Sequence, residues 1–207
     1  KSPTIAPYAK TSECFARVTA KADTPEECET LLQPVVKEIV ELLGDDVYGV
    51  DVDSLEQVVG DGLREKGLKL AVAESCTGGL LSKRITDVPG CSDYYLGGVC
   101  SYASEVKMNV LGVKKETLDT VGAVSAETAE QMAAGVAKAL GADIGVGITG
   151  IAGPGGGTED KPTGLVYISV WYKGENFTRK TNSSFGRDRV RMQAASTALD
   201  MIRRHIL

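Results

Sequence analysis

Hydrophobic residues recur along most of this chain with two different spacings, which alternate. Apolar runs of strand length cover residues 68–73, 94–102, 143–149, 165–172 and 177–183. Helical spacing begins at residue 80 and returns over residues 106–111, 126–140 and 188–205. The last two strands are separated by a short Lys-Gly-Glu segment, which predicts a hairpin. Strands that alternate with helices predict an α/β fold, here a three-layer α/β/α sandwich on a mixed, mostly parallel sheet.

The beginning of the chain follows a different pattern. Glycine is absent from the first 43 residues and frequent afterwards, and this shift in composition marks a boundary. Residues 14–20 alternate like a half-buried strand, and Pro25 opens a helix with one apolar stripe. Residues 45–53 predict a short strand or a linker. We therefore expect a small α+β module of β-α-β order over residues 1–50, followed by the larger domain over residues 54–207.

The sharpest change of pattern lies where the first buried strand of the larger domain stops on small polar residues. The turn consists of Glu74, Ser75, Cys76, Thr77, Gly78 and Gly79. A strand-to-helix turn of this kind points backbone N–H groups into the crevice where α/β proteins bind ligands. The two glycines permit close approach and leave Ser75, Cys76 and Thr77 as reactive groups. The turn predicts an active site, and an ordinary helix N-cap at Ser75 or Thr77 is the alternative.

Composition narrows the class of protein. Of the 207 residues, 43% are hydrophobic and 25% are charged, which is typical of a globular chain. The formal net charge of −5 argues against a nucleic-acid partner, because nucleic-acid binding usually needs a basic face. No apolar run approaches the roughly 20 residues that span a bilayer, so we expect no membrane partner.

Cysteine usage indicates a reducing compartment. The five cysteines show no metal-ligand spacing, and their odd number predicts neither a zinc site nor a disulfide framework. We therefore expect a cytoplasmic protein without a bound metal. Because the chain begins at Lys1 and not at methionine, we also expect it to be a fragment of a longer protein.

The scarcity of histidine limits the possible catalytic machinery. The chain has one histidine, His205, so an activated nucleophile would need another base, such as lysine, tyrosine or aspartate. Tyr102 and Lys107 follow the second core strand and can converge on the crevice beside the turn. A partly desolvated lysine there has a lowered pKa and can take the proton of Ser75, whereas a solvated lysine is the ordinary alternative. Cys76 is the rival nucleophile, although small buried cysteines are commonly structural.

Two further patterns suggest ligand contacts. Residues 145–150 match the dinucleotide pattern GxGxxG, but these glycines fall inside a predicted strand and no helix follows, so the match is weak. The long glycine-rich loop over residues 150–164 predicts backbone N–H groups that line a site, with a mobile surface connection as the alternative. Three arginines at alternate positions, Arg187, Arg189 and Arg191, begin the last helix and include a candidate phosphate anchor.

Four segments of the chain together resemble one family. Residues 73–79 (Ala-Glu-Ser-Cys-Thr-Gly-Gly), 101–107 (Ser-Tyr-x4-Lys), 122–125 (Gly-Ala-Val-Ser) and 149–156 (Thr-Gly-Ile-Ala-Gly-Pro-Gly-Gly) are similar, in this order and spacing, to the carboxy-terminal domain of CinA. The first 50 residues resemble the KH-like middle domain of that family. The resemblance implies a nicotinamide-nucleotide (NMN) amidohydrolase, which converts NMN and water to nicotinic acid mononucleotide and ammonia. It also implies that a further amino-terminal domain is missing from this chain.

The resemblance assigns roles to individual residues. Ser75 matches the nucleophile, Lys107 the general base, and Tyr102 the neighbouring group that supports proton transfer. The substrate would contact Thr77, Gly78, Gly79, Thr149, Gly150, Gly153 and, through its phosphate, Arg187. No cofactor is implied, and we expect a homodimer. The KH-like part shows no Gly-x-x-Gly loop, so it predicts no nucleic-acid clamp. Two other classes stay open: a nucleotide-binding module without catalysis, and a protein that acts in competence or DNA damage.

Overall fold

The structure is a computed structural model that describes residues 2–207, and the chain divides into two compact units, Lys1–Val50 and Asp51–Leu207. None of the helices in the described part of the chain combines the length and the apolar character needed to cross a membrane. The larger unit contains all the residues to which a catalytic or substrate-binding role is assigned above.

The smaller unit has the order ββα. Strands β1 (Thr4–Ala9) and β2 (Cys14–Thr19) pair antiparallel, and helix α1 (Pro25–Leu43) and a 3₁₀ turn η1 (Gly44–Asp46) follow. The predicted β-α-β order was therefore wrong: a strand precedes residue 14, and the described residues form none over 45–53. Pro3 and Pro7 conceal the first strand in the sequence. Both strands of a two-stranded sheet are edge strands, which tolerate proline.

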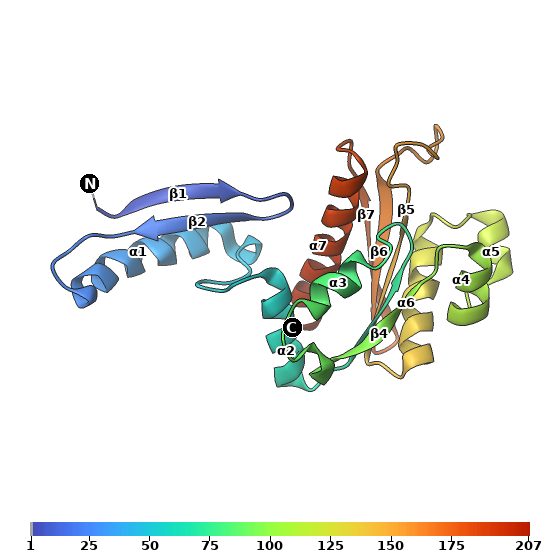
Figure 1. Cartoon of the computed structure of the whole chain (residues 1–207), viewed down its shortest axis with the longest axis horizontal. Coiled ribbons are helices and arrows are strands. Elements are labelled where there is room, and N and C mark those ends of the chain that lie inside the picture. Colours follow the sequence, from blue (N-terminus) through green and yellow to red (C-terminus); the bar gives the residue numbers. More distant parts are fainter. Residues whose placement is uncertain (1) are drawn as a thin grey trace. The chain divides into compact units, whose positions relative to one another are not determined.

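A five-stranded sheet forms the centre of the larger unit (Figure 1). Its strands are β3 (Leu70–Glu74), β4 (Tyr95–Cys100), β5 (Ile144–Gly150), β6 (Leu165–Tyr172) and β7 (Glu175–Asn182). Their order is β4-β3-β5-β6-β7. β3 is parallel to both of its neighbours, whereas β5, β6 and β7 pair antiparallel. The mixed sheet and the hairpin of β6 and β7 confirm the sequence prediction.

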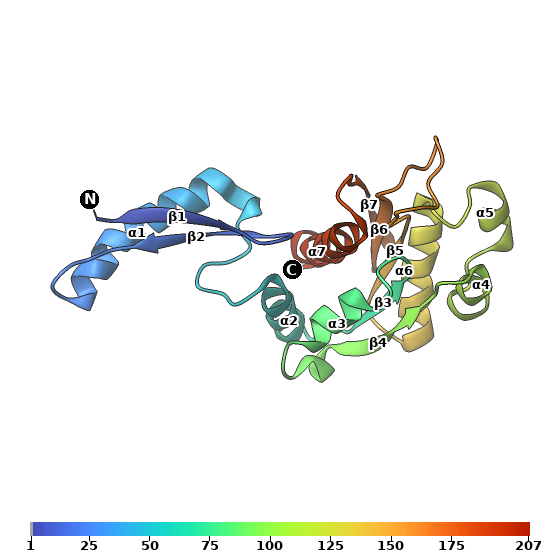
Figure 2. The same ribbon diagram turned by 45° about the horizontal axis from the view of Figure 1, so that its top comes forward.

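Helices cover both faces of this sheet (Figures 1 and 2). One face carries α2 (Leu55–Lys66), α3 (Leu80–Thr86) and α7 (Arg187–Ile206), and a 3₁₀ turn η2 (Cys91–Asp93) leads into β4. The other face carries α6 (Ala126–Leu140), with α4 (Ser104–Leu111) and α5 (Lys115–Thr120) beside it. The three-layer α/β/α sandwich is therefore confirmed, and α5 is a helix that the hydrophobic pattern did not predict.

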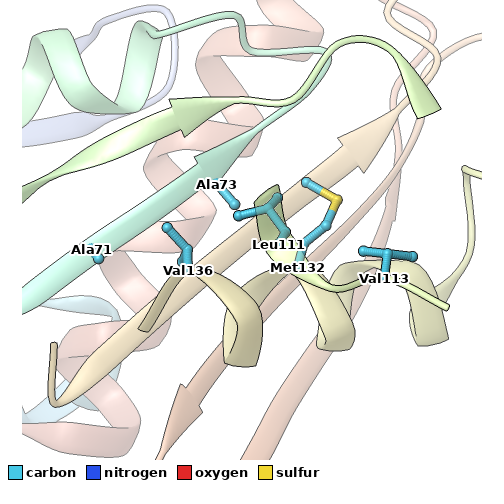
Figure 3. Close-up of a cluster of buried hydrophobic side chains, with 6 residues drawn as sticks. All are labelled: Ala71, Ala73, Leu111, Val113, Met132 and Val136. Atoms are coloured by element: carbon cyan, nitrogen blue, oxygen red, sulfur yellow. The ribbon is translucent and has the colours of Figure 1, made fainter. Parts of the chain in front are cut away.

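A cluster of buried side chains joins β3 to the layer of α4 and α6 (Figure 3). Its members are Ala71, Ala73, Leu111, Val113, Met132 and Val136. Because side chains alternate between the two faces of a strand, Ser75 continues the row of Ala71 and Ala73 on this side. Glu74 belongs to the opposite row, which faces α3.

The first two glycines of the GxGxxG match, Gly145 and Gly147, allow a helix to pack closely. A Cβ atom on Gly145 would lie 1.9 Å from the carbonyl oxygen of Ala133, and one on Gly147 would lie 2.1 Å from that of Ala129. Both distances are far shorter than any van der Waals contact, so α6 can lie this close to β5 only where the strand has no side chains. The pattern therefore records close packing within the fold.

Candidate active site

The turn after β3 holds Ser75 at the carboxyl edge of the sheet. Ser75 N–H donates to the carbonyl of Ile148 on β5 at 3.0 Å, and Gly78 N–H donates back to the carbonyl of Ser75 at 3.1 Å. Gly78 and Gly79 have φ angles of 57° and 92°, which side chains other than glycine rarely adopt. The strand-to-helix turn expected from the sequence is therefore present, and its two glycines are needed for its backbone conformation.

Glu74 fills the amino-terminal end of helix α3. Its Oε2 accepts hydrogen bonds from the backbone N–H groups of Gly79 and Leu81, both at 3.0 Å. Its Oε1 accepts from the N–H of Ser82 at 2.8 Å and from the hydroxyl of Ser82 at 2.7 Å. The side chain is buried, with 1% of its surface exposed. This carboxylate already neutralises the positive end of α3, so the anion-binding role expected for that end is occupied by the chain itself.

Lys107 reaches Ser75 from helix α4. Its Nζ lies 3.2 Å from Ser75 Oγ, and it also donates to the carbonyls of Ser101 at 2.5 Å and Tyr102 at 3.5 Å. Lys107 is 1% exposed, and this burial lowers its pKa, because the charged form loses its hydration. In the neutral amine, two N–H bonds can serve the two carbonyls, which leaves the lone pair for the Ser75 hydroxyl. The arrangement suits a general base.

Tyr102 meets this pair through its backbone. Its carbonyl accepts from Lys107 Nζ, whereas its side chain is 68% exposed. The predicted convergence of Tyr102 and Lys107 therefore occurs, but the contact is made by the carbonyl and not by the phenol. An exposed aromatic ring at the edge of the site is available to a ligand.

Cys76 lies next to Ser75 in a different environment. The side chain is buried, and desolvation raises the pKa of its thiol to about 11. A thiol with this pKa stays protonated at neutral pH, and the protonated form is a poor nucleophile. Of the two neighbours, Ser75 is therefore the better candidate for the nucleophile, because it has a base within hydrogen-bond distance.

Two backbone donors beside Ser75 make no hydrogen bond to another residue. Among residues 2–207, the amide N–H groups of Cys76 and Thr77 donate to no other residue, whereas those of Gly78 and Gly79 are bonded to Ser75 and Glu74. The oxygen of the Thr77 side chain is also buried without a hydrogen-bond partner in the described chain. Adjacent free amides next to a nucleophile are what an oxyanion needs.

Thr149 and the glycine-rich loop border the site on the β5 side. Thr149 is buried, and its hydroxyl donates to the carbonyl of Ala123, in the loop before α6, at 2.6 Å. Gly150 ends β5, and a Cβ atom there would lie 2.6 Å from the carbonyl oxygen of Leu165. Thr149 is thus close to Ser75, although its hydroxyl is already engaged with the backbone.

Two arginines of helix α7 reach the same edge of the sheet. Arg187 Nη1 donates to the carbonyl of Gly153 at 2.9 Å, and Arg191 Nη2 donates to the carbonyl of Thr77 at 2.7 Å. The Nε atom of Arg191 is buried and has no partner within residues 2–207. Arg191 is therefore closer to the turn at Ser75 than Arg187, and the sequence alone did not distinguish them.

Sequence reasoning missed the role of Glu74. An acidic residue that ends a buried apolar strand directly before a helix was the available signal, because burial of a carboxylate requires several donors. Within residues 2–207, no group of three or more histidine, cysteine or acidic side chains is arranged to hold a metal ion.

Known families match both units of the chain. A family model described as the CinA C-terminal domain matches residues 52–206, and one described as the damage-inducible protein CinA KH domain matches residues 1–49. A "Putative competence-damage inducible protein" of Clostridium acetobutylicum is 51% identical over 206 residues, which are 100% of this chain and 50% of that protein. A "CinA-like protein" of Kosmotoga olearia is 49% identical with the same coverage. The chain spans about half the length of these curated relatives.

Solved structures match the larger part of the chain. The crystal structure of the competence/damage inducible protein CihA from Agrobacterium tumefaciens has a TM-score of 0.71 and 37% identity, and the match covers 75% of this chain and 96% of that chain. A competence damage-inducible protein A from Klebsiella pneumoniae has a TM-score of 0.71 and 32% identity, covering 73% and 94%. The names of these proteins refer to competence and damage induction and do not name a reaction.

Proposed function

Because the chain belongs to the CinA family, we propose that its larger unit is a nicotinamide-nucleotide amidohydrolase. The reaction is the hydrolysis of the carboxamide of NMN to a carboxylate, with release of ammonia. The observation that carries the proposal is the 3.2 Å distance between Ser75 Oγ and the Nζ of the buried Lys107. The family resemblance supplies the substrate, and this pair supplies a nucleophile and a base.

The first step is attack on the carboxamide carbon. Neutral Lys107 takes the proton of the Ser75 hydroxyl as Oγ bonds to the carbon, and the carbonyl oxygen becomes an oxyanion. The amides of Cys76 and Thr77, which follow Ser75 directly and donate to no other residue within 2–207, are the donors that would receive that charge. One such donor typically contributes about 3 kcal/mol of transition-state stabilisation.

The second step releases ammonia. Protonated Lys107 gives its proton to the leaving nitrogen, the C–N bond breaks, and an ester to Ser75 remains. Water then attacks the ester carbon while Lys107 accepts a proton from that water. As the bond between this carbon and Ser75 Oγ breaks, Lys107 returns the proton to Oγ, and the carboxylic acid formed loses its own proton to solvent to give the carboxylate. Lys107 thus acts alternately as base and acid, for which a lowered pKa is favourable.

The remaining predicted residues would hold the substrate. In this proposal Thr77, Thr149, Gly150 and Gly153 shape the floor around the pyridine ring, and Gly78 and Gly79 contribute by leaving space. Arg187 would bind the phosphate, and Arg191 is the second candidate because its guanidinium lies beside the turn. We retain Tyr102 as an aid to proton transfer, through the carbonyl that bonds Lys107.

The direct test is release of ammonia from NMN by the purified chain. We expect turnover by the wild type and a loss of at least about 10³-fold in kcat for Ser75→Ala. Ser92→Ala, which removes an exposed serine far along the chain from the turn, is the matched control and should keep full activity.

The outcomes separate the classes of function. NMN binding without ammonia release by the wild type would favour a nucleotide-binding module that lacks catalysis. Absence of both binding and turnover would favour the remaining class, a role in competence or DNA damage; the printed name of one relative refers to competence and damage induction. Either result would overturn the amidohydrolase.

A further inference from the structure

The hydroxyl of Ser101 is buried without a hydrogen-bond partner. Ser101 follows β4 directly, 0% of its surface is exposed, and its Oγ makes no hydrogen bond within residues 2–207. Its backbone is bonded: the N–H donates to the carbonyl of Glu74 at 2.8 Å, and the carbonyl accepts from Lys107 Nζ at 2.5 Å. Buried hydroxyl groups in native proteins nearly always have a partner, so an unpaired one next to Lys107 requires an explanation.

Ser101 lies in the row of side chains that faces the layer of α4 and α6, as Ser75 does. β3 and β4 are parallel neighbours whose last residues are paired, so Ser75 and Ser101 follow them side by side. Side chains alternate along a strand, and Val99, two residues before Ser101, packs against the buried cluster on that face. Lys107 comes from α4 on the same face, and its Nζ lies 3.2 Å from Ser75 Oγ. The amine thus contacts both serines, the hydroxyl of one and the carbonyl of the other.

The number of hydrogen-bond donors on Lys107 changes during the proposed reaction. Neutral Lys107 has two N–H bonds, which the carbonyls of Ser101 and Tyr102 accept, and one lone pair, which is left for the Ser75 hydroxyl. Once protonated, Lys107 has three N–H bonds and no lone pair. At that stage Ser75 Oγ is bonded to the substrate carbon and is a weaker acceptor than a free hydroxyl. The third N–H of the ammonium therefore needs another acceptor within this buried site.

Ser101 Oγ is the acceptor in place for that N–H. A serine hydroxyl has two lone pairs, and those of Ser101 are unused within residues 2–207. Because the Ser101 carbonyl already holds Lys107 Nζ, the hydroxyl of the same residue can turn toward the nitrogen by rotation about its Cα–Cβ bond. Within the described chain, the Cys76 thiol is the one titratable group that acts on Lys107, and with a pKa of about 11 it stays neutral. Neutral oxygen atoms must therefore stabilise the ammonium.

We propose that Ser101 is a positioning residue, whose hydroxyl accepts the third N–H of protonated Lys107 and so holds the ammonium in place between its two proton transfers. The inference rests on the proposed function, because it takes Lys107 to be the base of that reaction. The proton that leaves Ser75 stays on Lys107, hydrogen-bonded to Ser101 Oγ, until the leaving nitrogen takes it. The same contact serves when Lys107 takes a proton from water and returns it to Ser75.

The test removes the oxygen of Ser101 in two variants of different size. In Ser101→Ala and Ser101→Cys we expect kcat for NMN to fall about tenfold with KM within about twofold, because the contact forms only after proton transfer. Ser101→Thr keeps the hydroxyl and should recover most of kcat. The free energy of unfolding of Ser101→Ala should not fall, since this variant removes a buried hydroxyl that has no partner in the described chain. Ser92→Ala is the control and should behave like the wild type.

Failure of this inference is distinguishable from failure of the proposed function. Wild-type kcat in Ser101→Ala or Ser101→Cys would overturn the role of Ser101 while the amidohydrolase stands. A stably folded Ser101→Thr that is no faster than Ser101→Ala, or a loss of kcat that only accompanies a loss of stability, would do the same.

If the wild type releases no ammonia, the pKa of Lys107 is measured by NMR of the full chain with isotope-labelled lysine. The background is Ser75→Ala, in which the ammonium cannot bond to the Ser75 hydroxyl, and the Lys107 signal is the one that Lys107→Met lacks. A lower pKa of Lys107 in Ser75→Ala/Ser101→Ala than in Ser75→Ala would support the contact, because the double variant loses an acceptor for the charged form. An equal or higher pKa would overturn it.

Discussion

The two sides of the turn at Ser75 differ in how completely their polar groups are bonded. On the α3 side, Glu74 accepts four hydrogen bonds, from three backbone amides and one hydroxyl, and the network is closed. Around Ser75 and Lys107, the amide and the buried hydroxyl of Thr77 and the Nε of Arg191 have no partner in the part of the chain that the structure describes.

This difference separates the polar groups that hold the turn in place from those that are available to a ligand. Buried polar groups cost free energy unless they are hydrogen-bonded. Several such groups without a hydrogen bond beside a nucleophile therefore indicate that a bound ligand supplies the missing partners. The hydrogen bonds of Glu74, here called the closed side, hold the backbone of the turn. Substitutions on the closed side should therefore change stability, and substitutions on the open side, around Ser75 and Lys107, should change activity.

Removal of the base should have the largest effect on activity. In Lys107→Met we expect kcat to fall by at least about 10³-fold, because the Ser75 hydroxyl loses the amine that would accept its proton. The free energy of unfolding at neutral pH should change little, because relief from burying the amine is offset by the Ser101 and Tyr102 carbonyls, which lose their donor. Ammonia assays and urea denaturation measure the two effects. A variant that is both inactive and much less stable would contradict this assignment to the open side.

The closed side should respond in the opposite way. Glu74→Gln places an amide donor against backbone donors and should lower the free energy of unfolding by about 3 kcal/mol. Ser82→Ala removes one of the four hydrogen bonds and should cost about 1 kcal/mol. Denaturation of both variants, with Ser92→Ala as the control, gives the comparison. Equal stability of Glu74→Gln and wild type would show that the network does not hold the turn.

The pH dependence of the rate reports on the open side. Burial lowers the pKa of Lys107, and the neutral amine is the active form, so kcat/KM should rise with pH through an apparent pKa below the ordinary lysine value of about 10.4. Between these two pKa values the unfolded chain holds a proton that the folded chain lacks, so the free energy of unfolding should also rise with pH. Both trends should vanish in Lys107→Met. A limb of the pH profile that persists there would assign the base elsewhere.

The sequence predicted the parts of the site that strand order determines. Ser75 and Lys107 follow adjacent strands, β3 and β4, and the carboxyl ends of parallel neighbours meet at one edge, so their proximity followed from the hydrophobic pattern. The sequence could not show that Glu74, from the strand itself, folds back onto α3. A helix start is visible in a local pattern, but the side chain that satisfies it depends on the path of the turn.

Other differences have similar causes. The GxGxxG match had been judged weak from the sequence, and the close approach of α6 to Gly145 and Gly147 explains these glycines, because glycine marks any close approach, whether by a phosphate or by a helix. The ring of Tyr102 was expected at Lys107, but spacing fixes only where a backbone lies, and here the carbonyl makes the contact. The hydrophobic pattern thus predicts which residues lie at the carboxyl edge of the sheet, but it does not predict which of their atoms form hydrogen bonds there.

The smallest expected effect concerns Cys76, which adjoins the nucleophile but faces a buried environment. With a thiol pKa of about 11, the thiolate fraction at pH 7.5 is about 0.1% or less, so iodoacetamide should leave Cys76 unmodified and activity intact. Cys76→Ser should change kcat by no more than about threefold, since the backbone amide remains. Mass spectrometry provides an internal comparison, because Cys14 is exposed and should be alkylated under the same conditions. Loss of activity in step with alkylation of Cys76 would transfer the role of nucleophile from the hydroxyl to the thiol.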